Sequence, residues 1–172
     1  IKKSILVKYI SMMNLSKHLW EENKKLALVS LNSNFVQGIQ SGNLPKKIFQ
    51  AYIAQDYFFL ESFARAYGLA ISKCLDINSI RTLSDLLVGV SKELMLHETY
   101  SNQWGIDLTN NKISKATKEY TDFLSETSLN CDCIEILAAM APCMRLYAWI
   151  GQNLATPAPT TIYKEWIITY SD

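Results

Sequence analysis

Residues 49–73 read FQAYIAQDYFFLESFARAYGLAISK, and this stretch decides the fold class. Tyr52, Asp56, Phe59 and Phe63 fall at positions i, i+4, i+7 and i+11, which places them on one face of an α-helix. No alternation of apolar and polar residues persists in the chain for more than a few positions, whereas helical spacing recurs along it. The sequence therefore predicts an all-α protein.

Glycine and proline are sparse, and they divide the chain into long helices. Only six glycines and four prolines occur in 172 residues, and Pro45 stands where a first helical turn tolerates proline. Asn130 or Asp132 can cap the helix that follows them. We expect breaks at 32–33, 41–43, 75–76, 105–111 and 156–157. The predicted helices span 4–31, 34–41, 45–73, 77–104, 112–128, 131–154 and 159–170, packed as one domain over residues 1–172.

Composition argues against several classes of protein. The formal net charge of +1 gives no field that would attract nucleic acid or an anionic membrane. No uninterrupted apolar run reaches the roughly 20 residues of a membrane span. The start, IKKSILVKYISMM, is interrupted by Lys8 and lacks a small-residue cleavage site, which is unlike a signal peptide. Since no methionine begins the chain, we expect a fragment. The four cysteines predict a cytoplasmic protein with reduced, mostly buried thiols: Cys74, Cys131, Cys133 and Cys143.

Asp56 places a carboxylate on an aromatic face that ought to belong to the core. An unpaired buried carboxylate is costly, so this residue needs a partner or a polar ligand. One interpretation is a salt bridge to an arginine such as Arg65 or Arg145. The other is an acid that anchors an aromatic ligand bearing N–H donors. Spacing alone does not decide between the two.

The stretch 138–151, AAMAPCMRLYAWIG, combines a core-helix pattern with an interior proline. Such a proline costs roughly 3 kcal/mol, and it usually marks a useful kink or a helix end. Cys143 follows Pro142 at once and shares a face with Tyr147. The thiol is either a buried structural cysteine or a nucleophile that the kink directs into a pocket. Tyr120 and Tyr170 are further aromatic residues with polar ends.

A metal site has little support in the sequence. Glu93 and His97 stand at i and i+4 with Glu98 next, as metal ligands can. His18 and His97 are the only histidines, and both are more typical of surface or helix-packing positions. We therefore expect no metal.

Three separated segments together resemble the TenA family, the thiaminase II or aminopyrimidine aminohydrolase group, and its plant-type members in particular. They are NFVQGIQSGNLPKKIFQAYIAQDYFFLESFARA, EILAAMAPCMRLYAWIG and IYKEWIITYS. The resemblance runs from about residue 20 to the end of the chain. It implies a haem-oxygenase-like helical bundle, usually a homotetramer, which acts on a small pyrimidine without metal or organic cofactor. We expect a tetramer or dimer.

The resemblance also implies a role for each site residue. Asp56 matches the acid that holds the pyrimidine amino edge, and Cys143 matches the nucleophile. The tyrosines that would line the pocket are Tyr120, Tyr147 and Tyr170, and Phe59 stands where some members carry another tyrosine. The implied reaction converts 4-amino-5-aminomethyl-2-methylpyrimidine, its formyl derivative or thiamine to the hydroxymethylpyrimidine.

The end of the chain leaves alternatives open. The family supplies a glutamate from a C-terminal helix as the acid, and we expect that helix to lie beyond Asp172. On this expectation residues 1–172 alone would be nearly inactive. The rival interpretation is a pyrimidine-binding or scaffold protein without turnover. A third is an oxidase of the same fold, which bound iron would support.

Overall fold

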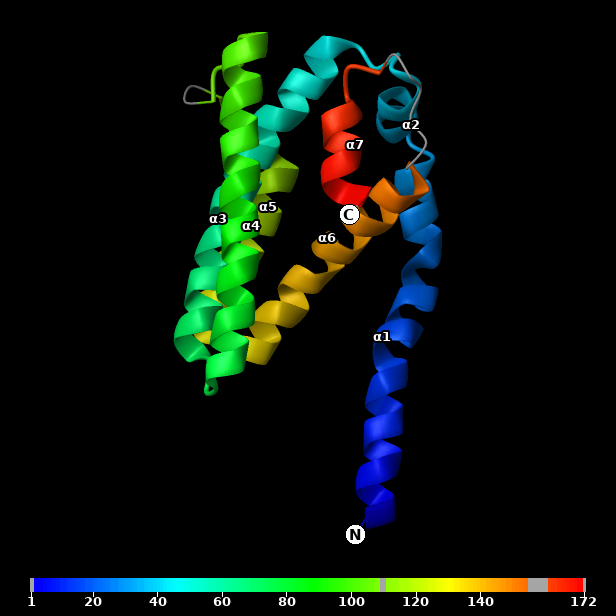
Figure 1. Cartoon of the computed structure of the whole chain (residues 1–172), viewed down its shortest axis with the longest axis vertical. Helices are drawn as coiled ribbons and strands as arrows, with labels where there is room; N and C mark the ends of the chain where they lie inside the picture. Colours follow the sequence, from blue (N-terminus) through cyan, green and yellow to red (C-terminus); the bar gives the residue numbers. More distant parts are fainter. Residues whose placement is uncertain (1, 109–110, 155–160, 172) are drawn as a thin grey trace. The chain divides into compact units, whose positions relative to one another are not determined.

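The computed structural model describes residues 2–108, 111–154 and 161–171, and for residues 2–14 it describes the backbone alone. These residues form seven helices and no strand (Figure 1). The helices are α1 (Lys2–Leu31), α2 (Asn34–Ser41), α3 (Lys46–Lys73), α4 (Ile77–Trp104), α5 (Lys115–Asn130), α6 (Cys133–Asn153) and α7 (Lys164–Ser171). The all-α class is confirmed.

Short polar side chains begin the helices at the expected breaks. Ser33, Asp76 and Ser114 each accept a backbone N–H from the first turn of α2, α4 and α5 respectively. Of the two candidates before α6, Asp132 is the cap, because it accepts the backbone N–H of Glu135 at 2.9 Å. The Glu135 carboxylate accepts the N–H of Asp132 in return, which completes a capping box. The break at 156–157 lies outside the described residues.

The chain divides into two compact units, and single-domain organisation stays a prediction. One unit, residues 45–148, holds α3, α4, α5 and most of α6. In it, α3 lies against both α4 and α5 (Figure 1). Lys73, at the end of α3, donates to the carbonyls of Ser128 and Cys131 at 2.7 and 2.6 Å, which closes the C-terminus of α5. The buried core of this unit is apolar, and it comprises Leu60, Phe63, Ala66, Tyr67, Ala70, Leu83, Val90, Leu124, Ile136 and Met140.

Helix α6 continues through Pro142, which lies inside the helix and not at its end. Among the described residues, α6 alone has the length and mean hydropathy of a membrane span. Its sequence nevertheless carries Glu135 and Arg145, and Ile136 and Met140 are fully buried against the helical core. A core helix of a water-soluble protein meets the same length and composition criterion, so this observation does not make α6 a membrane span.

The other unit, residues 1–44 and 149–172, holds α1, α2, the end of α6 and α7. Gly42 ends α2 in the left-handed region, with φ of 75°. The hydroxyl of Thr161 donates to the carbonyl of Ile39 at 2.9 Å. The buried Tyr163 hydroxyl donates to the carbonyl of Leu44 at 2.6 Å. These bonds join the α2 turn to the segment that leads into α7.

Gly151 permits a close approach within this unit. A Cβ atom at that position would overlap the backbone carbonyl of Tyr170 on α7. The absence of a side chain therefore lets the end of α6 and the end of α7 meet backbone to backbone. Tyr170, one of the expected site residues, owes its position within this unit to that contact.

All four cysteines are free, and each is partly exposed. The sequence predicted mostly buried thiols, and the structure shows each of them partly buried, at a helix end or beside a cavity, with none fully buried. Cys74 follows the end of α3 and Cys133 begins α6, and their sulfur atoms lie 3.1 Å apart.

Gly151→Ala should destabilise the protein by about 1–3 kcal/mol, because the backbone of α7 would have to move to accommodate the methyl group. Urea unfolding followed by circular dichroism measures the change. Gly89→Ala is the matched control, since Gly89 is exposed on α4 and a Cβ there meets no atom within 4 Å. The control should gain up to about 1 kcal/mol from helix propensity. Equal stability changes in the two variants would contradict the close approach.

Candidate functional site

A cavity of about 530 Å³ opens between α3, α5 and α6 within the unit 45–148. This volume lies in the range of small-molecule sites. Five of the six site residues expected from the sequence line it. The lining is Tyr52, Gln55, Asp56, Phe59, Ala116, Thr117, Tyr120, Pro142, Cys143, Leu146 and Tyr147. The sixth residue, Tyr170, belongs to the other unit, where its ring lies 4.8 Å from that of Trp166. Its role in the site stays a prediction.

One wall of the cavity is aromatic. The rings of Phe59 and Tyr120 lie 5.3 Å apart at 31°, and Phe63 continues the group behind Phe59 at 5.2 Å. Burial raises the pKa of Tyr120 to about 12, with a smaller effect from Cys143 in its ionised form, so the hydroxyl stays protonated at neutral pH. That hydroxyl donates to the carbonyl of Ala139 at 3.3 Å. In a regular helix this carbonyl accepts the backbone N–H of Cys143, so Tyr120 also braces the turn that carries the thiol.

Gln55 fixes the chain at the mouth of the cavity, and sequence reasoning did not identify it. Its amide nitrogen donates to the carbonyl of Lys112 at 3.0 Å. Its amide oxygen accepts the backbone N–H of Ser114, the cap of α5, at 2.7 Å. One side chain on α3 thus holds the start of α5, the helix that carries Tyr120.

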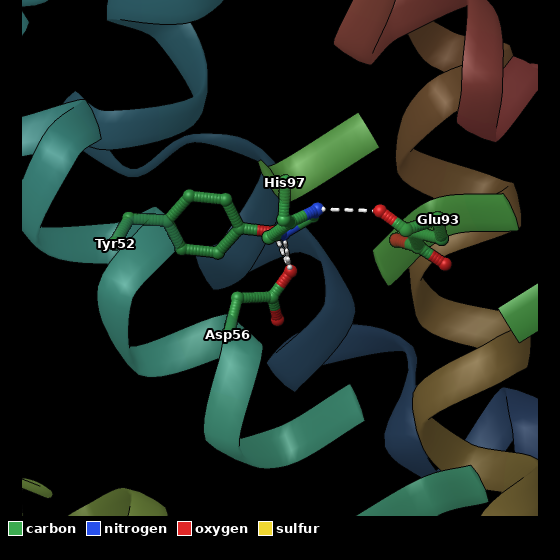
Figure 2. Close-up of polar contacts among 4 residues, drawn as sticks. All are labelled: Tyr52, Asp56, Glu93 and His97. Carbon is green, nitrogen blue, oxygen red and sulfur yellow. Dashed lines mark hydrogen bonds and ion pairs between the residues drawn. The ribbon is translucent and has the colours of Figure 1, made fainter. Parts of the chain in front are cut away.

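The carboxylate of Asp56 is 8% exposed and is held from two sides. The Tyr52 hydroxyl and Nε2 of His97 each lie 2.9 Å from its Oδ2 atom (Figure 2). The other oxygen, Oδ1, accepts no hydrogen bond from the described residues. Because Asp56 also lines the cavity, this oxygen is available to a ligand that donates an N–H or O–H group.

The partner of Asp56 is therefore His97, and the interpretation of a salt bridge to Arg65 or Arg145 is wrong. Arg65 is exposed and pairs with Glu61 at 3.5 Å on its own helix. Arg145 is exposed on α6. The short imidazole at 1% exposure fits a closed core position where a solvated guanidinium does not.

His97 carries its proton on a nitrogen that the geometry identifies. Nδ1 lies 2.9 Å from the backbone carbonyl of Glu93, which can only accept, so Nδ1 donates. A neutral ring would then leave Nε2 as an acceptor facing a carboxylate oxygen. Burial alone would lower the His97 pKa. The hydrogen bond and charge of Asp56, with smaller contributions from Glu93, outweigh burial and raise the pKa above its ordinary value of 6.5. We infer an imidazolium that donates to the Asp56 carboxylate.

The sequence did contain a signal for the burial of His97. Leu83, Val90 and His97 follow one another at seven-residue spacing on α4, and Tyr100 adds one further turn. All four are buried. A histidine that continues an apolar face must find a polar partner inside the protein. The i, i+4 pairing with Glu93 is present, but Glu93 contributes its backbone carbonyl to the ring and not a metal ligand.

Cys143 is a neutral thiol in the free protein. Burial, together with the negative charges of Asp56 and Glu93, raises its pKa to about 12. Burial and the charge of Asp56 also raise the pKa of Tyr147 well above its ordinary value, although a hydrogen bond with Tyr52 acts in the opposite direction. The cavity thus presents a single carboxylate among protonated thiol and phenol groups.

No group of three or more histidine, cysteine or acidic side chains lies close enough to hold a metal ion in the part of the chain that the structure describes. Both ring nitrogens of His97 are already engaged, one by Asp56 and one by the Glu93 carbonyl. This histidine is therefore not free to act as a metal ligand.

Comparison with known proteins gives consistent matches. The model of the TENA/THI-4/PQQC family matches residues 23–172. Over 176 residues the chain is 32% identical to the bifunctional TH2 protein, mitochondrial, of Arabidopsis thaliana, a match that covers 89% of this chain and 28% of that protein. It is 31% identical over 168 residues to an aminopyrimidine aminohydrolase of Halalkalibacterium halodurans, covering 92% of this chain and 74% of that protein.

A solved structure agrees with these matches. The structure of a TenA family transcription regulator from Silicibacter sp. TM1040 superposes with a TM-score of 0.82 at 30% identity. The match covers 90% of this chain and 70% of that chain. It confirms the expected haem-oxygenase-like helical fold.

The pair of His97 and Asp56 should make stability depend on pH in a defined direction. Because the folded pKa of His97 is raised, the stabilisation is complete below pH 6.5 and is lost as pH rises through the folded value. Urea unfolding between about pH 6 and about pH 8.5 should show falling stability in the wild type and a flatter profile in His97→Gln. The thiols and phenols ordinarily titrate near 9.0 and 10.0, above this window. Parallel profiles would contradict a charged His97.

Proposed function

Because the chain belongs to the TENA/THI-4/PQQC family, we propose that it is an aminopyrimidine aminohydrolase of thiamine salvage. The proposed substrate is 4-amino-5-aminomethyl-2-methylpyrimidine, with its formyl derivative and thiamine as the alternatives, and the proposed product is the hydroxymethylpyrimidine. One observation carries the proposal: a carboxylate with an available oxygen, an aromatic wall and a thiol all line one cavity.

The cavity suits a small aminopyrimidine in size and in chemistry. A single substituted ring fits within about 530 Å³. The ring can stack on Phe59 and Tyr120, whose planes are inclined by only 31°. Its amino group can donate an N–H to Oδ1 of Asp56, a charge-assisted hydrogen bond. Phe59 offers a stacking surface without a hydroxyl, so water near the reacting carbon would be held by other groups.

We propose covalent catalysis by Cys143 in two stages. The sulfur adds to the electron-poor ring carbon beside the carbon that carries the methylene, and the thiol proton passes to the ring nitrogen. Addition breaks the aromaticity of the ring. The electron pair of the amino nitrogen then expels ammonia from the protonated aminomethyl group. Water adds to the exocyclic methylene and loses a proton. The sulfur then leaves the ring carbon, and the proton on the ring nitrogen returns to it. The sum is amine plus water giving alcohol plus ammonia.

The proposed mechanism assigns distinct work to the protein groups. Asp56 orients the ring and stabilises positive charge that develops on the amino nitrogen. Because the Cys143 pKa is about 12, C–S bond formation and proton transfer have to be coupled. Tyr120 and Tyr147 supply hydroxyls that stay protonated at neutral pH. Tyr170 is proposed, from the resemblance alone, as a further pocket residue.

A pyrimidine-binding protein without turnover is the second candidate, and the missing hydroxyl at Phe59 favours it. Release of ammonia from the aminomethylpyrimidine separates the two, since binding alone produces none. Assaying the three candidate pyrimidines side by side with the full-length protein would identify which of them is the substrate. Assembly as a tetramer or dimer and a cytoplasmic location stay predictions of the same proposal.

Cys143→Ala should lower turnover by orders of magnitude while product affinity changes little, because ring stacking and the Asp56 contact do not need the sulfur. Ammonia release and calorimetric binding of the hydroxymethylpyrimidine on one sample measure the two effects. Cys131→Ala is the control, since that half-buried cysteine ends α5 and does not line the cavity. Wild-type turnover in Cys143→Ala would exclude the nucleophile assignment.

Asp56→Asn should weaken product binding at least about tenfold, because its one amide oxygen stays with Tyr52 and His97 and its amide nitrogen, a donor, replaces Oδ1 toward the ligand. The helix should remain folded, since an amide oxygen still accepts from Tyr52 and His97. Binding is measured by calorimetry, with Asp85→Asn, an exposed acid on α4, as the matched control. Full affinity combined with increased stability would identify Asp56 as a strained core acid without a binding role.

A further inference from the structure

A chain of hydrogen-bonded polar groups connects the wall of the cavity with three helices. Tyr147 of α6 is hydrogen-bonded to Tyr52 of α3, and Tyr52 donates to Oδ2 of Asp56. His97 of α4 contacts the same oxygen, and its other ring nitrogen contacts the Glu93 carbonyl (Figure 2). Asp56 lines the cavity, whereas His97 does not and is 1% exposed. Any effect of His97 on a ligand must therefore pass through Asp56.

We propose that His97 is a positioning residue that holds the Asp56 carboxylate through its Oδ2 atom and turns its Oδ1 atom toward the cavity. His97 thereby determines how tightly the protein binds ligands that present N–H donors. The nature of the ligand rests on the proposed function, whereas the state of the His97–Asp56 pair does not.

Two physical arguments support this role. First, a carboxylate that is 8% exposed is costly to bury without a hydrogen-bond donor beside it, and His97 is the donor that α4 supplies. Second, the two contacts to Oδ2 come from different helices, so they fix the rotation of the carboxylate and leave only Oδ1 facing the ligand.

The groups around the pair identify Asp56 as the direct partner of the histidine. On α3 the neighbours are Asp56 itself and Tyr52, and on α4 Glu93 adds a backbone acceptor and a negative charge. On α6, Cys143 and Tyr147 lie close enough to feel the charges of Asp56 and Glu93, but both are neutral at neutral pH. Asp56 is the carboxylate whose oxygen contacts the imidazole at 2.9 Å.

The first experiment needs neither substrate nor turnover. The imidazole of His97 is titrated by NMR in the full-length wild type and in Asp56→Asn, with the exposed His18 as internal reference. We expect His97 to titrate above 6.5 in the wild type and to shift downward in Asp56→Asn. A His97 that titrates below 6.5 in the wild type, or whose titration does not respond to Asp56→Asn, would overturn the proposal.

The second experiment uses two amides that each replace one ring nitrogen. In His97→Gln the amide nitrogen can reach the position of Nε2 and still donate to Asp56. In His97→Asn the shorter amide reaches only the position of Nδ1 and leaves Asp56 without this donor. We expect the dissociation constant of 4-amino-5-hydroxymethyl-2-methylpyrimidine to rise at least about tenfold in His97→Asn, which loses the donor and the positive charge, and by a smaller factor in His97→Gln, which loses only the charge. Equal affinities in the two variants would overturn the proposal, since a histidine with only a packing role predicts no difference between them.

The double variant Asp56→Asn/His97→Asn shows whether His97 acts through Asp56. If it does, the double variant binds the pyrimidine no more weakly than Asp56→Asn alone. Multiplicative losses would assign His97 an independent role and overturn the proposal. If the wild type binds the pyrimidine but releases no ammonia, the hydrolase assignment fails and all three tests stand. If it binds no pyrimidine, the proposed function fails and the NMR titration still decides the state of the pair.

Discussion

The buried contact between Asp56 and His97 is the constraint on which the site depends. It joins α3 to α4 through two ionisable side chains that are almost entirely removed from water. Separating such a pair leaves an uncompensated charge in the interior, and that penalty is several kcal/mol. The two helices are therefore locked in the register that places Asp56 at the cavity. The apolar core on either side could tolerate other registers, but the ion pair cannot.

The same contact explains why one carboxylate can serve in a site surrounded by neutral groups. Burial and the negative charge of Asp56 discourage ionisation of Cys143 and Tyr147, so both groups keep their protons at neutral pH. Only Asp56 has a counter-charge, and it lies on the side away from the cavity. The site is thus polarised, with positive charge behind the carboxylate and an acceptor oxygen in front.

Much of this arrangement could be predicted from the sequence. Helical spacing located all seven helices to within a few residues wherever the chain is described, because long amphipathic stretches and short capping residues are local signals. The prediction that Tyr52, Asp56 and Phe59 share one helix face was also correct, since all three line the cavity. The partner of Asp56 was not predicted, because periodicity indicates that His97 is buried but not which helix it contacts. That information lies in the packing of α4 on α3.

The raised pKa of Cys143 has a consequence for chemical modification. Alkylating reagents react with thiolates. A thiol with a pKa of about 12 forms almost no thiolate at neutral pH. Cys133 behaves similarly, because burial and its contact with Cys74 raise its pKa to about 11. Slow alkylation is therefore expected of Cys143 at neutral pH. Reagents shaped like the proposed pyrimidine ligand, which bring an electrophile and a proton acceptor together, are better suited to modify it.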